Sequence, residues 1–313
     1  MLVIMKKFTS IILAVVLTLL FVGCENANKN GVDEGVIVVD DLGREVAVSS
    51  FSRVAALTGS LGDIWMLAGG TLCAVAEDAW SELSLELDDG TLNLGNSHSL
   101  SRDTIISLSP DLVIASSRLT NQLELKEAFE GCGIKVLYFD IPDVEGYLKV
   151  LDKLTSITGR EDRYAEYGEK IEQEVSQIIE RNKEREAQKV LVLRASSSSI
   201  KVKNSDGTML GGMLRDLGCI NIADNDAHML ESLNVEGILL SDPDKIFVLQ
   251  MGDDIETVKR ETYRMFNENP LWYEITAVKE GRVYFMEKRL YNIKPNARFA
   301  EAYEGVEKIL NER

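Results

Sequence analysis

The chain has 313 residues, of which 45% are hydrophobic, and its formal net charge is −17 at pH 7. This length and apolar share are sufficient for one large domain or two lobes of ordinary size. The acidity excludes the basic footprint of a nucleic-acid-binding protein and argues against broad electrostatic attachment to an anionic membrane.

The first 23 residues have the pattern of a lipoprotein signal peptide. Lys6 and Lys7 introduce an apolar run that ends in Leu20-Phe21-Val22-Gly23, and Cys24 follows the small residue directly. A positive start, an apolar core and a small residue before the cleavage point are typical of secretory signals. The run is short for a transmembrane helix, although a plain N-terminal anchor helix is the alternative. We therefore expect an extracytoplasmic chain, lipid-anchored to the cell membrane through Cys24, with residues 24–35 as a flexible tether.

Three further cysteines, Cys73, Cys132 and Cys219, lie in or beside apolar segments without CxxC spacing. Small buried residues are the expectation for all three, and a Cys73–Cys132 disulfide is left open.

Residues 36–143 are predicted to form an N-terminal lobe. Asp40-Asp41-Leu42-Gly43 lies between two short apolar segments and indicates a hairpin. Strands and helices then alternate. The predicted strands are 36–39, 45–48, 53–57, 72–76, 111–115 and 135–139. The predicted helices are 64–67, 102–108 and 122–129.

Residues 144–187 are predicted to be helical throughout, interrupted only at Gly159. Apolar residues recur at helical spacing on both sides of this glycine. A helix over 161–186 would span about 39 Å at 1.5 Å per residue. A dimeric coiled coil is the alternative, but the apolar period covers few heptads.

Residues 188–313 are predicted to form a C-terminal lobe of the same kind. The predicted strands are 190–193, 245–249 and 283–286. The predicted helices are 208–217, 235–240, 255–267 and 296–310. Alternation of strands and helices indicates α/β lobes with mainly parallel sheets, and two such lobes create a cleft suited to a ligand.

Several segments, in this order, resemble the substrate-binding lipoproteins of ABC transporters, in the iron–siderophore, haem and cobalamin class. These are DDLGREV, RVAALTGSLGDIWMLAGG, SLSPDLVIA, LGCINIAD, VEGILLSDPDKIF and KEGRVYFMEKRLYNIKPNARFAEAYE. The resemblance covers about residues 36–312. It implies two Rossmann-like lobes joined by a long rigid helix, which is the class III, helical-backbone metal-receptor type. It also implies capture of a ferric siderophore, haem or cobalamin-type ligand, and docking onto a permease dimer with its ATPase.

Ligands of open α/β sheets meet the loops at the carboxyl ends of the strands, which selects nine candidate residues. Ser60, Ser116 and Ser117 are candidate hydrogen-bond donors, or simple helix caps. Trp80 and Tyr291 offer flat apolar walls, or are ordinary half-buried aromatics.

Arg194 and Arg289 are suited to the carboxylates of an anionic ferric chelate, or form ion pairs within the lobes. His98 and His228, the only histidines, lie on predicted cleft loops of different lobes. They are candidate axial ligands of a haem iron, with Met229 as a further candidate, although a loop histidine is more often structural. No resident cofactor is expected, while the ligand itself would contain iron or cobalt.

Two acidic residues are candidates for permease docking by the same resemblance. Asp103 and Glu236 each lie near the start of a predicted helix, where the family carries an acid that pairs with permease arginines. Asp103 departs from the usual glutamate. Complementation of the helix dipole is the alternative role.

No GxSxG, HExxH or phosphate-loop motif is present, so an enzyme is not expected. Two other hypotheses stay open. One is a membrane-tethered sensor or interaction protein on the same fold, and the more remote one is a chelatase-like enzyme. We expect a monomer, because a closing cleft must be free to meet its transporter.

Overall fold

The computed structural model describes residues 35–252 and 254–312, so the predicted signal peptide and Cys24 lie outside the described residues. Residues 36–313 form one unit, to which the description below refers. It begins with the predicted hairpin. Strands β1 (Val36–Val39) and β2 (Glu45–Val48) pair antiparallel, and Gly43 turns the chain with a φ of +74°. This prediction is confirmed to the residue.

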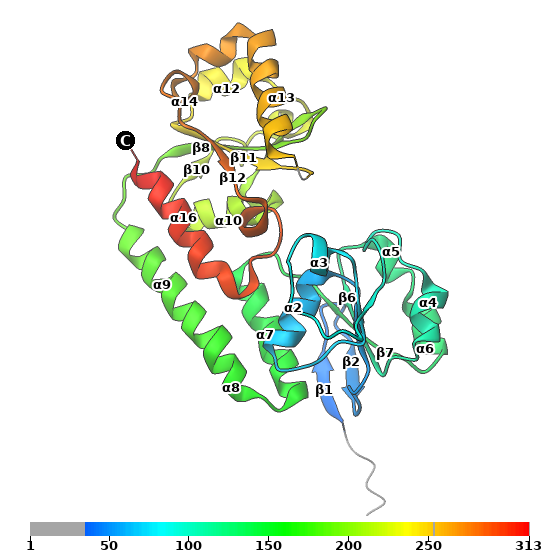
Figure 1. Ribbon diagram of the computed structural model, residues 1–313. Helices are drawn as coiled ribbons and strands as arrows, with labels where there is room; N and C mark the ends of the chain where they lie inside the picture. Colours follow the sequence, from blue (N-terminus) through cyan, green and yellow to red (C-terminus); the bar gives the residue numbers. More distant parts are fainter. Residues whose placement is uncertain (1–34, 253, 313) are drawn as a thin grey trace, which may run out of the picture. The chain divides into compact units, whose positions relative to one another are not determined.

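The first lobe is built on a five-stranded parallel sheet in the order β5-β4-β3-β6-β7. Its strands are β3 (Val54–Ala56), β4 (Ala74–Val75), β5 (Leu92–Asn93), β6 (Leu112–Ser116) and β7 (Lys135–Phe139). Helices α2 (Gly59–Leu67) and α7 (Val144–Thr158) pack on one face, and α4 (Arg102–Ser107) and α6 (Lys126–Gly131) pack on the other. Figure 1 shows these helices on the two sides of the sheet. Because both faces are covered, most strand residues are apolar.

Local capping explains one difference from the sequence prediction. Helix α2 begins at Gly59 rather than Ile64, because the Thr58 hydroxyl oxygen accepts a hydrogen bond from the Leu61 amide at 3.3 Å. The two glycines of this first turn concealed the start of the helix. Two short helices, α3 (Asp78–Ser81) and α5 (Thr120–Leu123), and strand β5 were also not predicted as separate elements.

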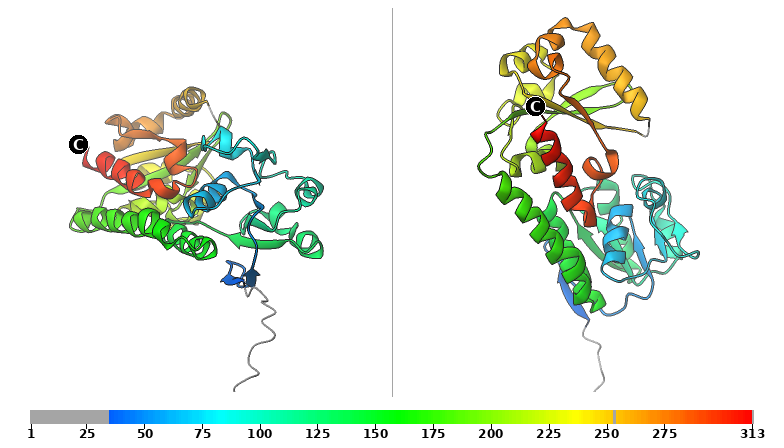
Figure 2. Two further views of the ribbon diagram at one scale, coloured as in Figure 1. Left: turned by 60° about the horizontal axis from the view of Figure 1, so that its bottom comes forward. Right: turned by 60° about the vertical axis from the view of Figure 1, so that its left-hand side comes forward.

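A helical connection joins the two lobes. Helix α7 ends at Gly159, whose φ of +66° suits a left-handed helix cap. The predicted helix over 161–186 is realised over 161–182 as α8 (Glu161–Tyr164), a π-helical turn (Ala165–Glu169) and α9 (Lys170–Asn182). In both views of Figure 2, α9 runs alongside the last helix, α16 (Phe299–Asn311). Arg181 forms an ion pair with Glu307 across this contact.

The second lobe has a sheet in the order β10-β8-β11-β12, with β9 pairing antiparallel to β8. Its strands are β8 (Lys189–Ala195), β9 (Ile200–Lys203), β10 (Ile220–Asn221), β11 (Lys245–Gln250) and β12 (Val283–Met286). Helices α10 (Met209–Asp216) and α16 pack on one face. On the other face are α12 (Val235–Ser241), α13 (Ile255–Glu268), the 3₁₀ turn η3 (Pro270–Glu274) and α14 (Thr276–Lys279). The α/β, two-lobed prediction is confirmed.

One apolar cluster runs from the first sheet through α2, α7, α9 and α16 to the second sheet. At its centre the rings of Tyr147 and Phe299 lie 5.5 Å apart. A smaller apolar cluster covers the outer face of each sheet, one in the first lobe and one in the second. Burial of continuous apolar surface between the lobes is the main force that holds them together. Within the described residues, no helix is long and apolar enough to cross a bilayer.

Candidate functional site

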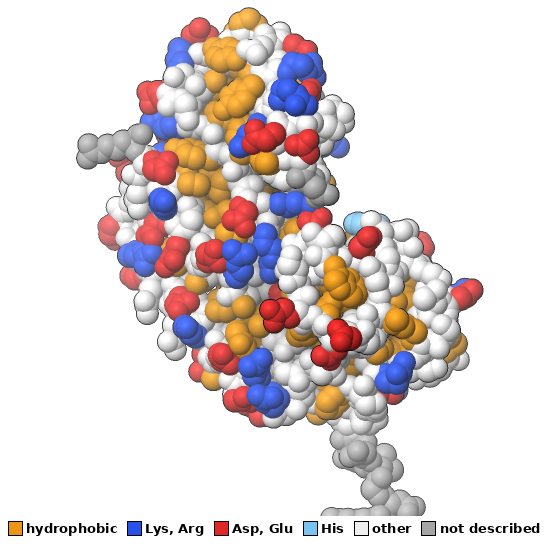
Figure 3. Space-filling view, viewed as in Figure 1, with side chains coloured by type: hydrophobic (Ala, Val, Ile, Leu, Met, Phe, Trp, Pro, Cys, Tyr) orange, Lys and Arg blue, Asp and Glu red, His pale blue; other side chains and the backbone are white. Residues whose placement is uncertain are grey.

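The surface is hollowed between the two lobes (Figure 3), and a cavity of about 420 Å³ lies in this cleft. Every strand of the first sheet sends the loop at its carboxyl end to the cavity wall, as the strand-end rule predicts. The first lobe contributes Thr58, Ser60, Leu61, Asp78, Ser97, His98, Ser116, Arg118, Leu119, Phe139, Asp140, Ile141 and Pro142. The second lobe contributes Asp206, Gly207, Thr208, Met209, Asn292, Ile293 and Lys294.

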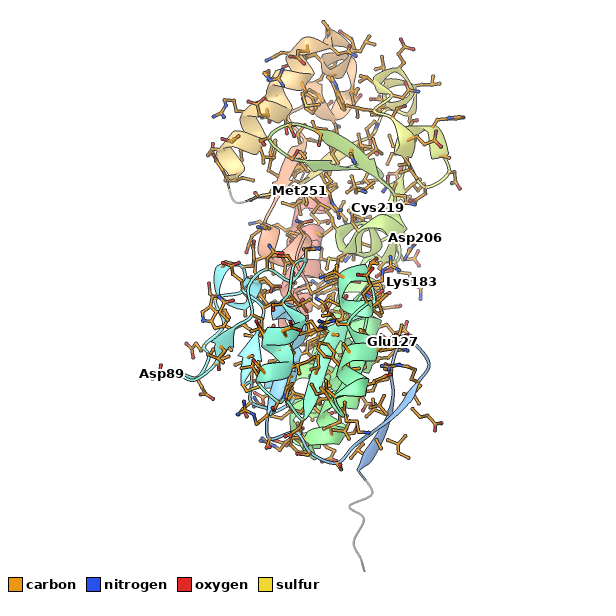
Figure 4. The ribbon with its side chains drawn as sticks, turned by 90° about the vertical axis from the view of Figure 1, so that its right-hand side faces the viewer. Asp89, Glu127, Lys183, Asp206, Cys219 and Met251 are labelled. Atoms are coloured by element: carbon orange, nitrogen blue, oxygen red, sulfur yellow. The ribbon has the colours of Figure 1, made fainter. Side chains whose placement is uncertain are left out.

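The second-lobe wall comes from two separate segments. One is the 3₁₀ turn η2 (Ser205–Gly207) with the start of α10, and the other follows α15 (Lys288–Tyr291). Asp206, at the first of these segments, is labelled in Figure 4 on the side of the second lobe nearest the first. A ligand in this cavity is therefore within reach of both lobes.

Buried Gln122, which the sequence analysis did not select, holds three first-lobe loops together. Its side-chain oxygen accepts a hydrogen bond from the Ser116 amide at 2.8 Å. Its side-chain nitrogen donates to the carbonyl oxygens of Leu57 at 2.8 Å and Ser97 at 3.2 Å. The loops after β3, β5 and β6 thus have fixed positions before any ligand arrives. Nothing in the sequence distinguishes this glutamine from a surface helix residue.

The cleft contains charged groups of both signs. Burial raises the pKa of Asp78, which the Gly59 amide and the nearby His98 partly offset, and one carboxylate oxygen of Asp78 is buried without a hydrogen-bond partner. Lys294 donates from Nζ to the Ile141 carbonyl oxygen across the cleft, and burial lowers the pKa of this lysine. Arg118 lies 3.7 Å from Asp140. Polar and charged groups that converge on one concave wall, beside apolar side chains such as Leu61 and Phe139, are typical of small-molecule sites.

Three of the nine predicted ligand residues line this cavity. Ser60, His98 and Ser116 are on the wall, whereas the neighbouring Ser117 donates its amide to the Phe139 carbonyl oxygen at 3.0 Å. His228 is exposed on α11 (Ala227–Glu231) and does not line the cavity. Met229 is buried in the outer core of the second lobe, so it is not available as a haem ligand in this structure.

Three other candidates are used in packing within the lobes or between them. Trp80 is half-buried against the large apolar cluster. Tyr291 is only 5% exposed, and its hydroxyl donates to the Ala302 carbonyl oxygen at 3.1 Å. Arg289 lies 3.7 Å from the Asp63 carboxylate and donates to the Lys294 carbonyl oxygen at 2.8 Å. The strand-end rule located these segments but not the direction of each side chain.

Arg194, the last of the nine candidates, belongs to a cluster of cations at the end of β8. It pairs across the strands with Lys201, and Lys203 lies on the same face of β9. Val190 and Val192, which alternate with Arg194 along β8, belong to the cluster shared by both lobes, so these cations are on the face turned toward the first lobe.

None of these three cations has an acidic partner among the described residues. Burial lowers the pKa of Arg194, and its Nε is buried without an acceptor. Burial and the charges of Arg194 and Lys201 together lower the pKa of Lys203. Positive charge is therefore left uncompensated on this face of the second sheet, although none of the three cations lines the cavity itself.

The two predicted docking acids are both exposed in the first turn of a helix, Asp103 in α4 and Glu236 in α12. Asp103 accepts a hydrogen bond from the neighbouring Arg102 at 3.0 Å. In the described part of the chain, no group of three or more potential metal-ligating side chains is present. Cys73, Cys132 and Cys219 are all free, so no Cys73–Cys132 disulfide is formed.

Comparison with known proteins supports the resemblance seen in the sequence. The model of a family described as "Periplasmic binding protein" matches residues 54–290. A Bacillus subtilis protein named "Putative ABC transporter substrate-binding lipoprotein YhfQ" is 25% identical, over 98% of this chain and 97% of its own length. The Staphylococcus aureus "High-affinity heme uptake system protein IsdE" is 26% identical over 62% of this chain and 65% of its own.

A solved structure shows the same fold. The ABC transporter substrate-binding protein from Listeria monocytogenes superposes with a TM-score of 0.70 at 21% identity, covering 83% of this chain and 99% of its own. These relatives are binding proteins rather than enzymes, in agreement with the sequence prediction.

Proposed function

The chain belongs to the periplasmic binding protein family, and from this premise we propose that it is the extracytoplasmic solute-binding lipoprotein of an ABC importer. It captures an anionic metal chelate in the interlobe cleft and delivers the chelate unchanged to the permease. The observation that carries the proposal is the cavity of about 420 Å³ walled by both lobes. Volumes of this order suit small-molecule ligands.

The uncompensated cations Arg194, Lys201 and Lys203 support an anionic ligand. Arg194 and Lys203 are half-buried and Lys201 is exposed. Half-buried positive charge without a counter-ion is unfavourable, so an arriving carboxylate or catecholate recovers part of the lost stabilisation. Arginine is well suited to this role because its planar guanidinium binds two oxygens at once. Ferric siderophores with acidic or catecholate groups have this chemistry.

The test uses the soluble chain from residue 25 onward and a panel of ferric tris-catecholate, ferric citrate, haemin and cyanocobalamin. Quenching of tryptophan fluorescence reports binding. We expect a ferric catecholate or citrate to bind, and Arg194→Ala to weaken this binding by at least about tenfold, since a charge-assisted hydrogen bond contributes roughly 1.5–3 kcal/mol. Arg260→Ala, on the outer helix α13, is the matched control and is expected to have no effect. Equal binding by wild type and Arg194→Ala would contradict the anionic subsite.

Haem is the second candidate ligand. It is favoured by His98 on the cavity wall and by the similarity to a protein named for heme uptake. Haemin would then give a Soret band that shifts on His98→Ala. The exposed His228 lies outside the cavity wall. If the Soret band also shifts in His228→Ala, α11 must move toward the ligand on binding. No Soret change after incubation with haemin excludes this candidate.

Docking and anchoring are tested separately from ligand affinity. The double variant Asp103→Lys/Glu236→Lys is expected to abolish uptake in cells while ligand affinity stays unchanged. The matched control changes Glu127 and Glu256 to lysine, which are exposed acids in the first turns of α6 and α13. Unchanged uptake in the Asp103/Glu236 variant refutes the docking role. Cys24→Ser is expected to release the protein from the membrane fraction.

A further inference from the structure

Residues 288–298, here called the crossing segment, extend from the second lobe to the first. They include α15 and the 3₁₀ turn η4 (Asn296–Arg298), and they precede α16. Lys288 Nζ lies 2.6 Å from Glu82 Oε1 of the first lobe, and Lys294 reaches the Ile141 carbonyl oxygen. The lobes are thus linked by a second stretch of chain, separate from the helical connection of residues 144–182.

Asn296 is the most deeply placed polar contact of the crossing segment. It is completely buried, and its Nδ2 donates to the Ser60 carbonyl oxygen at 3.0 Å and to Asp63 Oδ2 at 2.8 Å. Its φ of +54° is in the left-handed region, which asparagine tolerates better than most residues. Ser60 and Asp63 both belong to the start of α2, so one side chain fixes the position of this helix against the second lobe.

Asp63 and Arg289 form a charged pair beside Asn296. Their closest side-chain atoms are 3.7 Å apart, and the two side chains are 16% and 18% exposed. Burial raises the pKa of Asp63, while the Asn296 hydrogen bond and the Arg289 charge lower it. Removal of either partner leaves a polar group poorly solvated and without its counterpart.

We propose that Asn296, together with Asp63 and Arg289, is a positioning cluster that sets the angle between the lobes and holds the Ser60 turn in the cleft wall. Apolar packing holds the lobes together without fixing direction, whereas these hydrogen bonds join particular atoms of α2 to the crossing segment and so specify its orientation. The consequence for ligand binding rests on the proposed function. The consequence for lobe orientation does not, so the test uses ligand-free protein.

The first measurement is hydrogen exchange of the ligand-free chain carrying Asn296→Ala. We expect amides in residues 59–67 and 288–298 to exchange at least about tenfold faster than in wild type. In the variant these hydrogen bonds are absent, so local opening of the two segments costs less free energy. Asn182→Ala is the matched control. Asn182 is also buried and donates two hydrogen bonds, to the Ile178 carbonyl oxygen at 2.7 Å and to Glu307 at 2.6 Å, so its bonds lie within α9 and between α9 and α16.

The second measurement is a spin-label distance between the lobes. Labels at Glu127→Cys in α6 and Arg260→Cys in α13, with Cys73 and Cys132 replaced by serine, report the lobe angle. The distance distribution is expected to broaden in Asn296→Ala and to stay as in wild type in Asn182→Ala.

If Asn296→Ala does not fold, Asp63→Asn serves instead, because it keeps an acceptor for Asn296 and removes only the charge opposite Arg289. A folded variant with wild-type exchange rates and an unchanged distance distribution overturns the proposal. If Asn296→Ala shows faster exchange and a broader distance distribution but no chelate binds the wild-type protein, only the proposed function is refuted.

Discussion

Alanine at Gly211 is expected to destabilise the protein, while alanine at the next residue, Gly212, is expected to stabilise it. Both glycines lie in the first half of α10. A Cβ on Gly211 would lie 2.7 Å from the Ser205 Cα and carbonyl oxygen and 2.9 Å from the Asn204 carbonyl oxygen. A Cβ on Gly212 would have no neighbour within 4 Å. The helix therefore approaches the η2 turn through the bare face of Gly211.

The magnitudes follow from two opposing effects. Replacing a helical glycine by alanine gains up to about 0.8–1 kcal/mol of helix propensity at either position. At Gly211 the overlap with three backbone atoms adds an overpacking cost of roughly 1–3 kcal/mol, near the top of that range because backbone moves less easily than a side chain. It also strains the hydrogen bond from the Gly211 amide to the Thr208 hydroxyl. The propensity gain is the same in both variants, so they should differ by the overpacking cost alone, about 3 kcal/mol, with opposite signs relative to wild type.

Urea unfolding followed by far-UV circular dichroism measures this difference directly. The slope of unfolding free energy against urea should be the same in both variants, so the midpoints alone report the change. The displaced turn continues directly into residues 206–208, which line the cavity, so Gly211→Ala should also weaken ligand binding and Gly212→Ala should not. The reasoning is refuted if Gly211→Ala is as stable as Gly212→Ala.

Three further outcomes are expected. Trp272→Ala should lose about 3–5 kcal/mol, since this ring is 1% exposed and stacks on Phe266 at 4.3 Å, whereas the exposed Tyr273→Ala should lose far less in the same urea assay. Exposed Cys132 should react with a thiol reagent well before Cys219, because burial raises the pKa of the Cys219 thiol to about 11; simultaneous reaction in folded protein would contradict this. Burial raises the pKa of Asp78, so its contribution to stability is present below the ordinary carboxyl pKa and is lost as the pH rises through the folded value. Asp78→Asn should therefore raise the urea midpoint at pH 7 but not at pH 3, and an equal change at both pH values would argue against a raised pKa.

Short-range patterns in the sequence were sufficient to place most regular elements. The strands at residues 36–39, 45–48, 135–139 and 283–286 were predicted with the bounds that the structure has. Each is a short apolar segment bounded by turn-forming or charged residues, so its local composition defines it. Strand β9 was not predicted, although the alternation of apolar residues with lysine in Ile200–Lys203, directly after a run of serines, is itself a strand and hairpin pattern.

The cleft was predicted as a location, not as a set of contacts. Ser60, His98 and Ser116 line the cavity because they follow parallel strands closely, and the edge of the sheet brings such loops together. Arg289 and Tyr291 follow β12 in the same way, yet one pairs with Asp63 and the other is buried against α16. Which way a loop side chain points depends on the surface that packs against it.

The sequence by itself determined the α/β alternation, the two blocks and the helical stretch between them, because periodicity and turn residues act over a few neighbouring positions. Only the tertiary structure decided that Gln122 ties three loops together and that Asn296 joins α2 to the second lobe. These amides are indistinguishable from surface residues along the chain. Their roles arise from partners 65 and 236 positions away, and only packing of the folded chain brings such partners within hydrogen-bond distance.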